Sequence, residues 1–170
     1  MTYKITLDKF AKRCERLGGD LEQAALRGIR SAGERMVGVV VEKIGQPNRE
    51  EGVEHGANDN GELSGSVRCD HLPDGALVSV KAPHAAWLEF GTRPHPVSNE
   101  GFQALMDWAY RKGLADSEEE AERFAFLLRE SINAYGMQPR HYMARAVRAM
   151  KTRGILHDEV AKELAKLKGA

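Results

Sequence analysis

The chain has 170 residues, of which 42% are hydrophobic and 29% are charged, the proportions of an ordinary globular domain. Lys and Arg number 25 and Asp and Glu also number 25, so the formal net charge is zero. This balance excludes a global electrostatic attraction to nucleic acid or to anionic membranes, so any such contact must come from a local patch.

Cysteine usage and the N-terminal sequence bear on where the protein works. Cys14 and Cys69 stand far apart, and neither belongs to a CxxC pair, so we expect both to be reduced and structural. The N-terminal sequence MTYKITLDKF has no apolar run, and no stretch approaches the roughly 18 apolar residues of a membrane span. We therefore expect a protein that is made and kept in the cytosol, or in a particle assembled there.

Two helices are predicted in the N-terminal part of the chain. Residues 3–7 alternate apolar and polar side chains, which indicates a short strand or extended segment. A short helix over residues 10–17 is predicted to end at the glycine pair 18–19, and a second helix of about 25 residues is predicted from Asp20 to Ile44. The apolar residues of the short helix are Phe10, Cys14 and Leu17. The stripe of the second helix consists of Leu21, Ala25, Ile29, Ala32, Met36, Val39, Val40 and Ile44.

A loop and a hairpin are predicted next. Residues 46–62 hold turn formers and charges with one branched aliphatic residue, Val53, which has nothing near it in sequence to pack with. We expect this segment to be a mobile loop. Residues 63–69 and 76–81 are typical of two strands, and the turn-forming sequence Pro-Asp-Gly lies between them. The sequence therefore predicts a β-hairpin over residues 63–81.

The rest of the chain is predicted to be helical. Residues 85–90 can form a short helix, with Trp87 and Phe90 on one side, that is ended by Gly91. Residues 98–135 are predicted to form two helices, each begun by a capping serine and followed by a glycine. The apolar stripe of the second of them consists of Ala121, Phe124, Ala125, Leu128, Ile132 and Tyr135.

Two further helices complete the prediction. Pro139 suits the first turn of a helix that ends near Gly154, and the tail is predicted to form a last amphipathic helix. The order is helix, helix, hairpin and then helices, without βαβ alternation or internal repeat. The expected fold class is α+β, with a long N-terminal amphipathic helix packed on a small antiparallel sheet. We expect one domain over residues 1–170, with 98–135 as a helical insertion. The apolar residues of the last two helices are Tyr142, Met143, Ala146, Val147 and Met150, and then Leu156, Val160, Leu164 and Leu167.

Common catalytic motifs are missing from the sequence. There is no GxGxxG, no GxxxxGK[ST] and no GxSxG, so nucleotide hydrolysis and serine nucleophile chemistry are not expected. His84, Glu89 and His95 are three possible zinc ligands, but their spacing matches no standard metal pattern. A small metallohydrolase at these residues stays an alternative. The preferred interpretation makes them loop and surface residues, with Glu89 as a structural acceptor for backbone N–H groups or for an arginine.

Positive charge gathers over residues 139–153, where Arg145 and Arg148 share one helical face. Such a strip could contact phosphates, so a DNA-binding or regulatory module is a second alternative. The preferred interpretation makes the strip the solvated side of an amphipathic helix, or a partner for acidic residues of a neighbouring subunit. The strip consists of Arg140, Arg145, Arg148, Lys151 and Arg153.

Three segments, taken in order, resemble one protein family over roughly residues 20–150. They are Gly61-Glu62-Leu63-Ser64-Gly65-Ser66, Ala85-Ala86-Trp87-Leu88-Glu89-Phe90-Gly91-Thr92 and Gly136-Met137-Gln138-Pro139-Arg140-His141-Tyr142-Met143-Ala144-Arg145-Ala146. Together they resemble the neck and tail-completion proteins of lambdoid siphophages and prophages, also described as head–tail joining, minor tail or virion morphogenesis proteins. The tetrapeptide Glu-Phe-Gly-Thr is the most specific part. Trp87 stands where the family has Tyr, and residues 139–143 replace a more apolar Pro-Phe-Leu form.

The resemblance implies a structural subunit of the virion, assembled in the bacterial cytoplasm, without catalysis or cofactor. It implies a ring of copies of the chain that contacts neighbouring head-connector and tail proteins, with at most a passing contact with genomic DNA and with neither a membrane nor a small-molecule substrate. Loop 46–62 would then order on contact with the adjoining ring. Gly91 is expected to have a positive φ. The assembly-motif residues are Gly61, Leu63, Ser66, Trp87, Glu89, Phe90, Gly91, Thr92, Pro139, Tyr142 and Ala146.

Overall fold

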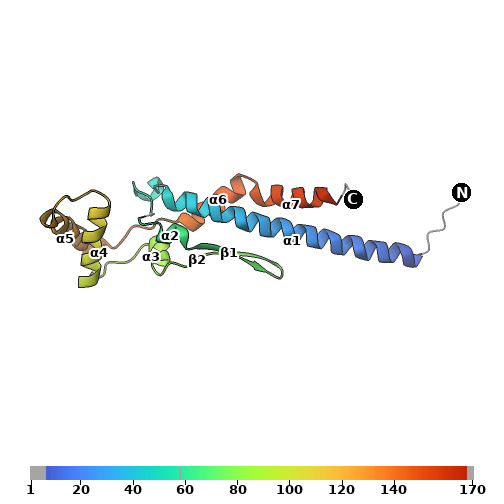
Figure 1. Cartoon of the computed structure of the whole chain (residues 1–170), viewed down its shortest axis with the longest axis horizontal. Coiled ribbons are helices and arrows are strands. Elements are labelled where there is room, and N and C mark those ends of the chain that lie inside the picture. Colours follow the sequence, from blue (N-terminus) through green and yellow to red (C-terminus); the bar gives the residue numbers. More distant parts are fainter. Residues whose placement is uncertain (1–6, 58, 168–170) are drawn as a thin grey trace. The chain divides into compact units, whose positions relative to one another are not determined.

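The structure is a computed structural model that describes residues 7–57 and 59–167. The fold is the expected α+β class, with a long N-terminal helix, a two-stranded hairpin and several C-terminal helices (Figure 1). The chain divides into two compact units. Unit 1 contains residues 1–39, 68–79 and 146–170, and unit 2 contains residues 40–67 and 80–145.

Helix α1 (Leu7–Gly45) is one continuous helix of 39 residues, about 58 Å long at 1.5 Å per residue. The predicted break at Gly18 and Gly19, and the predicted start of a second helix at Asp20, are therefore wrong. An exposed glycine costs a helix only about 1 kcal/mol relative to alanine. Because no proline or competing contact adds to that cost, the helix continues through the pair.

The apolar stripe of α1 is only partly as predicted. Its buried members are Ala32, Val39, Val40 and Ile44, whereas Leu21 is exposed. In the N-terminal half the buried positions are instead Ala24 and Gly28. Leu7 begins the helix rather than ending a strand, and the other residues of the predicted extended segment, Tyr3 and Ile5, lie outside the described residues.

The hairpin is present but begins later than predicted. Strands β1 (Val67–Leu72) and β2 (Gly75–Val80) form the two-stranded sheet. The first residues of the predicted strand instead form the short helix α2 (Glu62–Gly65), which starts after Gly61 in the left-handed region at φ 86°. The strand prediction for residues 63–66 is therefore wrong, because one helical turn buries Leu63 on its inner side.

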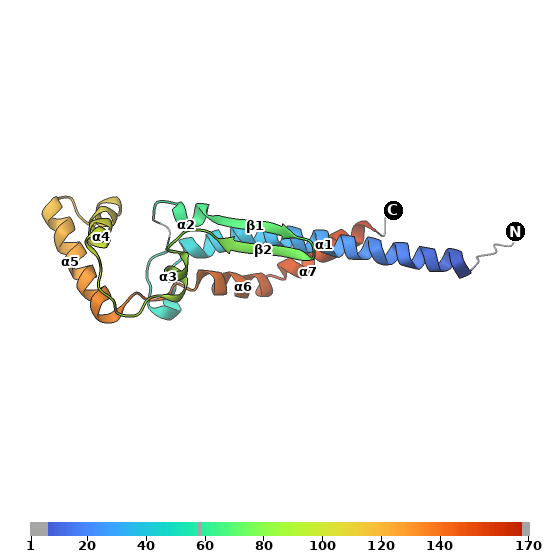
Figure 2. The ribbon, with the colours of Figure 1, turned by 90° about the horizontal axis from the view of Figure 1, so that it is seen from below.

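In unit 1 the hairpin packs on α1, as the sequence predicts (Figure 2). Gly33 makes this contact close, since a Cβ there would lie 2.7 Å from the Cβ of Ala76 and 2.9 Å from the Sγ of Cys69. Arg30 Nη2 donates to the carbonyl oxygen of Leu72 at 2.7 Å. Burial raises the pKa of the Cys69 thiol, with smaller contributions from nearby acidic residues, which favours the protonated thiol.

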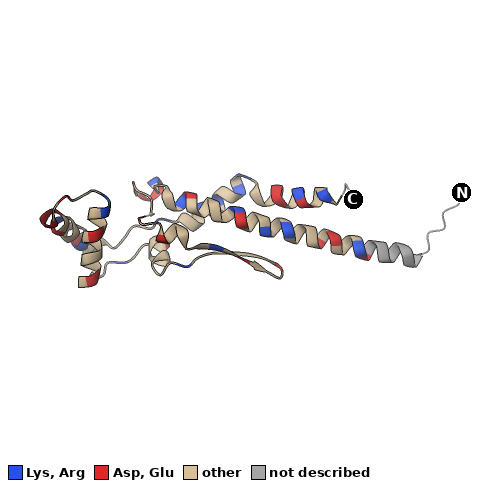
Figure 3. Ribbon diagram, in the orientation of Figure 1, with Lys and Arg blue, Asp and Glu red and all other residues tan. Residues whose placement is uncertain are grey.

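Helix α7 (Ile155–Lys166) packs against a different side of α1 in unit 1 (Figures 1 and 2). A Cβ on Gly28 would lie 2.5 Å from the Cα of Val160, so the two backbones are in contact there. Figure 3 shows acidic and basic residues mixed along both helices. The predicted buried face of α7 is shifted by one residue, because Ile155 is buried and Leu156 is 52% exposed.

The helical pair in unit 2 matches its prediction closely. In α4 (Asn99–Arg111), Ser98 Oγ accepts a hydrogen bond from the Gly101 amide at 3.1 Å, and in α5 (Glu118–Tyr135), Ser117 Oγ accepts one from the Glu120 amide at 3.3 Å. Tyr135 is exposed, however, although the predicted stripe includes it. The buried cluster of the pair consists of Met106, Ala109, Ala115, Ala121 and Ala125, with Phe102, Leu105 and Phe124 packed against it.

The segment 46–62 has defined contacts in unit 2. It contains the 3-10 helix η1 (Arg49–Glu51) and an antiparallel bridge in which the Val53 amide donates to the carbonyl oxygen of Asn48 at 2.9 Å. Asn48 and Val53 are both buried. The expectation that Val53 has nothing to pack with is therefore wrong, because the bridge folds the segment back on itself. The predicted mobility of the segment stays a prediction.

Candidate functional site

Glu89 connects α3 (Ala85–Phe90) to the first residues of α6 (Tyr142–Thr152) within unit 2. Its buried carboxylate accepts hydrogen bonds from the amides of Met143 at 2.9 Å and Ala144 at 3.1 Å. These two amides belong to the first turn of α6, where N–H groups have no partner inside the helix. A negative charge is also favoured at a helix N-terminus. The prediction that Glu89 accepts backbone N–H groups is confirmed. Its interpretation as a loop and surface residue is wrong, because Glu89 lies in α3 and is buried.

The carbonyl groups of α3 bind the chain that leads into α6. The amide of Arg140 donates to the carbonyl oxygen of Leu88 at 2.8 Å, and the amide of His141 donates to that of Glu89 at 3.1 Å. The buried Tyr142 hydroxyl donates to the carbonyl oxygen of Ala85 at 2.8 Å. Burial, and next the charge of Glu89, raise the pKa of Tyr142 to about 12, so the hydroxyl remains a donor.

Two glycines allow close contact between the segment that precedes the helical pair and the segment that follows it. Gly91 has φ 70°, and a Cβ there would lie 2.4 Å from the carbonyl oxygen of Met137. Gly136 has φ 73°, and a Cβ there would lie 2.0 Å from the carbonyl oxygen of Thr92. Thr92 and Met137 exchange two hydrogen bonds, both 3.0 Å long. The positive φ predicted for Gly91 is confirmed, and only glycine fits both conditions.

Pro139 does not lie in the first turn of α6, so that prediction is wrong. The helix begins three residues later, at Tyr142, because His141 has φ 49° and interrupts the helical backbone. Pro139 instead packs beside Gly91, with its Cδ 3.2 Å from the position of a Gly91 Cβ. Its carbonyl oxygen accepts a hydrogen bond from the Asn48 side chain at 3.5 Å.

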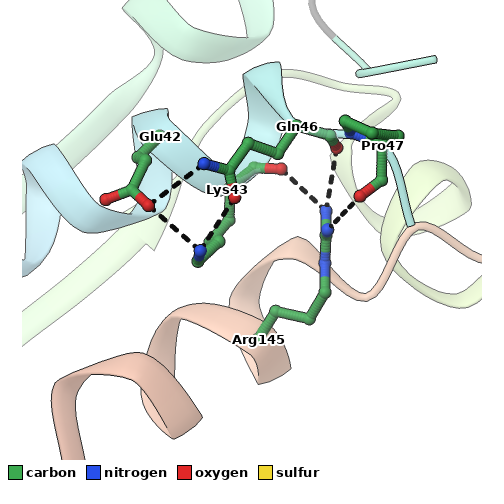
Figure 4. A network of polar contacts seen from close by, with 5 residues as sticks. All are labelled: Glu42, Lys43, Gln46, Pro47 and Arg145. Atoms are coloured by element: carbon green, nitrogen blue, oxygen red, sulfur yellow. Dashed lines mark hydrogen bonds and ion pairs between the residues drawn. The ribbon is translucent and has the colours of Figure 1, made fainter. Parts of the chain in front are cut away.

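The guanidinium group of Arg145 caps the C-terminal end of α1 (Figure 4). Its Nη1 donates to the carbonyl oxygen of Pro47 at 2.6 Å, and its Nη2 donates to those of Lys43 at 2.7 Å and Gln46 at 3.2 Å. Carbonyl groups at the end of a helix lack partners within it and favour a cation. Arg145 therefore satisfies the end of α1, while Glu89 satisfies the start of α6.

This role of Arg145 weakens the case for a DNA-binding strip. The Arg140 guanidinium also donates to a backbone carbonyl oxygen, that of His55. Burial lowers the pKa of both guanidinium groups, which fits side chains turned toward the protein. Sequence reasoning missed both bonds. The signal for Arg145 was its place three residues after the buried Tyr142, on the inner side of an amphipathic helix.

The first assembly-motif segment joins the same unit through Ser66. The Ser66 hydroxyl donates to the carbonyl oxygen of Leu63 at 2.8 Å and accepts from the Ala82 amide at 3.1 Å. The carbonyl oxygen of Ala82 then accepts from the Ala85 amide at 3.0 Å, which begins α3. Ten of the eleven assembly-motif residues thus lie in unit 2, and Ala146, buried on α6, falls in unit 1.

Helix α3 presents two large aromatic side chains outward. Trp87 is 59% exposed and Phe90 is 74% exposed, and they lie three residues apart on one face of the helix. Ala85 and Glu89 are buried on the other side. Neighbouring exposed aromatic residues are typical of a binding surface.

The metal site considered from the sequence does not form. Both carboxylate oxygens of Glu89 accept backbone amides, and His95 Nδ1 lies 2.8 Å from the carbonyl oxygen of Arg93. His84 immediately precedes α3. Among the side chains that the structure describes, those of residues 15–57 and 59–167, no group of three His, Cys, Asp or Glu is placed to hold a metal ion.

Comparison with known proteins adds no relative. No protein-family model, curated protein or solved structure matches the chain. Within the described part of the chain, no helix is both long and apolar enough to cross a lipid bilayer. The function therefore has to be inferred from the residues and geometry of the chain itself.

Proposed function

We propose that the chain is a structural subunit of the head–tail junction of a tailed phage or prophage, assembling as a ring in the neck of the virion. One observation carries the proposal. The three segments that resemble the neck and tail-completion family lie far apart in sequence, and hydrogen bonds connect them in unit 2 through Ser66, Ala82, Glu89 and the start of α6. The resemblance thus falls on residues that build one site.

The bonding of Glu89 supports a structural rather than a catalytic role. A general base needs a carboxylate that can reach a substrate proton. Glu89 is buried, and the Met143 and Ala144 amides occupy its two oxygens. Its replacement is expected to weaken the fold or the assembly, and not any turnover.

The contact surface of the proposed subunit is the outer face of α3. Large aromatic side chains contribute much of the binding energy at protein interfaces. Trp87 and Phe90 lie on the helix that Glu89 and Tyr142 bind to the start of α6, so the backbone that carries them is held in place. An exposed aromatic pair of this kind suits a neighbouring subunit or an adjoining neck protein.

A complementation experiment tests the proposal. A phage that lacks this gene is supplied with the wild-type chain, with Trp87→Ala/Phe90→Ala, or with the control Leu127→Ala. Leu127 lies on α5 and is 61% exposed, close to the value for Trp87. The aromatic variant is expected to keep the melting temperature of the wild-type chain but to yield full heads detached from tails in negative-stain images.

Two outcomes would contradict the proposal. If the phage that lacks the gene still forms a normal number of tailed particles, the protein is not a required subunit of the junction. Normal joining by the Trp87→Ala/Phe90→Ala variant, or an equal loss with Leu127→Ala, would remove the outer face of α3 as the contact surface.

A further inference from the structure

We call the N-terminal part of α1, residues 7–23, the arm, and its side chains are described from Glu15 onward. Every described side chain from Glu15 to Gln23 is exposed, including Leu17 at 55% and Leu21 at 45%. A Cβ on Gly18 or Gly19 would meet nothing within 4 Å. A helix segment without tertiary contacts is only marginally stable, particularly with two adjacent glycines. The arm therefore needs a partner surface to be a firm helix.

Leu17 and Leu21 continue the row of α1 residues that contacts α7, and we call this row the seam. This seam has a heptad spacing of alternating four and three residues, which is typical of paired helices. Later members of the seam contact α7: Gly28 touches the backbone of Val160, and Glu159 accepts hydrogen bonds from Ser31 at 2.7 Å and from Arg35 at 2.8 Å. Ala24, between the leucines and Gly28, is buried. The seam consists of Leu17, Leu21, Ala24, Gly28, Ser31 and Arg35.

The register of α7 shows which part of α1 it contacts. Arg27 pairs with Glu163 at 3.2 Å, whereas Ser31 bonds Glu159, so the two helices run antiparallel. Continuing this register places the last turn of α7 beside Ala24. Leu21 and Leu17 lie beyond it on the same seam, and Cys14 and Phe10 keep the same spacing in the sequence. Among the described residues, Leu17 and Leu21 thus extend this helix-pairing surface beyond the part of α1 that α7 contacts.

The charges of the arm indicate which partner fits. Residues 7–16 carry four basic and two acidic side chains, a net charge of +2, and residues 17–23 carry two acidic ones, a net charge of −2. Two arms side by side in antiparallel orientation place each positive half against a negative half, whereas a parallel pair places like charges together. Gly18 and Gly19 would allow close backbone contact, as Gly28 does with α7.

We propose that the arm is a self-association surface, which pairs antiparallel with the arm of a second copy of this chain through Leu17 and Leu21. An antiparallel pair of identical arms is two-fold symmetric, so it joins two free copies or two rings and not neighbours around one ring. The inference therefore goes beyond the proposed function. It is tested on the isolated full-length protein, so the two proposals can fail separately.

Sedimentation velocity over micromolar to near-millimolar concentrations is the first test. The wild-type chain is expected to dimerise, and Leu17→Lys/Leu21→Lys is expected to raise the dissociation constant at least about tenfold. The control, Leu127→Lys/Leu156→Lys, changes two comparably exposed leucines off the seam and is expected to dimerise normally. Circular dichroism checks that all three proteins keep their fold.

Charge reversal tests the orientation without touching the leucines. Arg13→Glu/Arg16→Glu makes both halves of the arm negative and is expected to weaken dimerisation, and Asp20→Lys/Glu22→Lys makes both halves positive with the same result. Combining all four changes restores opposite halves and is expected to restore dimerisation. In a parallel pair neither reversal alone would weaken binding, so that result would overturn the proposed geometry.

Other occupants of the arm appear as distinct outcomes. A wild-type chain that stays monomeric throughout overturns the proposal, and binding to phosphatidylglycerol vesicles in its place assigns the arm to a lipid surface. Unchanged dimerisation of Leu17→Lys/Leu21→Lys also overturns it, and leaves the proposed function intact if the Trp87→Ala/Phe90→Ala variant still fails to join heads and tails. If the protein forms dimers through the arm but is absent from virions, the inference about the arm stands and the proposed function fails.

Discussion

Glu89 and Glu159 are buried carboxylates, and each stabilises its own unit in a different way. Glu89 in unit 2 binds backbone amides at the start of α6, whereas Glu159 in unit 1 binds the side chains of Ser31 and Arg35. Backbone groups cannot be moved without moving the chain, but side chains can adopt other rotamers. The α3–α6 site is therefore expected to depend strongly on single residues, and the α1–α7 contact much less.

The largest effect is expected at Gly91. Gly91→Val combines a positive φ with a Cβ 2.4 Å from the Met137 carbonyl oxygen, and we expect a loss of about 3–5 kcal/mol in unfolding free energy by urea titration. Gly113→Val is the matched control, because Gly113 has φ 64° with nothing within 4 Å of a Cβ, and a loss of only about 1–2 kcal/mol is expected. Equal losses at the two positions would mean that the close approach contributes nothing.

An intermediate effect is expected at Glu89. Glu89→Ala removes the partner of two amides at the start of α6, and we expect a loss of about 2–3 kcal/mol in the same titration. Glu89→Gln keeps one acceptor oxygen and is expected to lose less. A loss below about 0.5 kcal/mol for Glu89→Ala would show that water replaces the carboxylate freely.

The smallest effect is expected at Glu159, and it depends on pH. Hydrogen bonds from Ser31 and then from Arg35 lower the pKa of Glu159. Its contribution to stability is therefore complete above the unfolded carboxyl pKa of about 4.3, and is lost as the pH falls through the lower folded value. Melting temperatures measured from neutral to acid pH should fall less steeply for Glu159→Gln than for the wild-type chain. Parallel curves for the two proteins would contradict this assignment.

The sequence predicts best where one local residue decides the structure. Ser98 and Ser117 cap the helices that follow them, and Gly91 and Gly136 end the helices that precede them, as expected. The break expected at Gly18 is wrong because a glycine only lowers helix propensity and does not forbid a helix. Propensity is a small energy, whereas a cap or a positive φ is a local geometric requirement.

The sequence predicts that Glu89 belongs to the site, but it does not predict which distant residues bind Glu89 and Arg145. The sequence indicates that Glu89 accepts backbone N–H groups, yet the two amides belong to residues more than fifty positions away. Arg145 likewise binds carbonyl groups about a hundred positions earlier in the chain. One sequence shows the chemical need of a helix end, but the fold decides which side chain meets it.

The bonded pair Thr92 and Met137 has a consequence for how such a chain can evolve. Everything between them, including the whole of α4 and α5, leaves and rejoins the rest of unit 2 at adjacent points of the backbone. A segment with neighbouring ends can be lengthened, exchanged or trimmed to a tight turn without displacing its flanks. The helical pair is thus placed as a replaceable cassette, in which lineages can vary while the residues around Glu89 stay fixed.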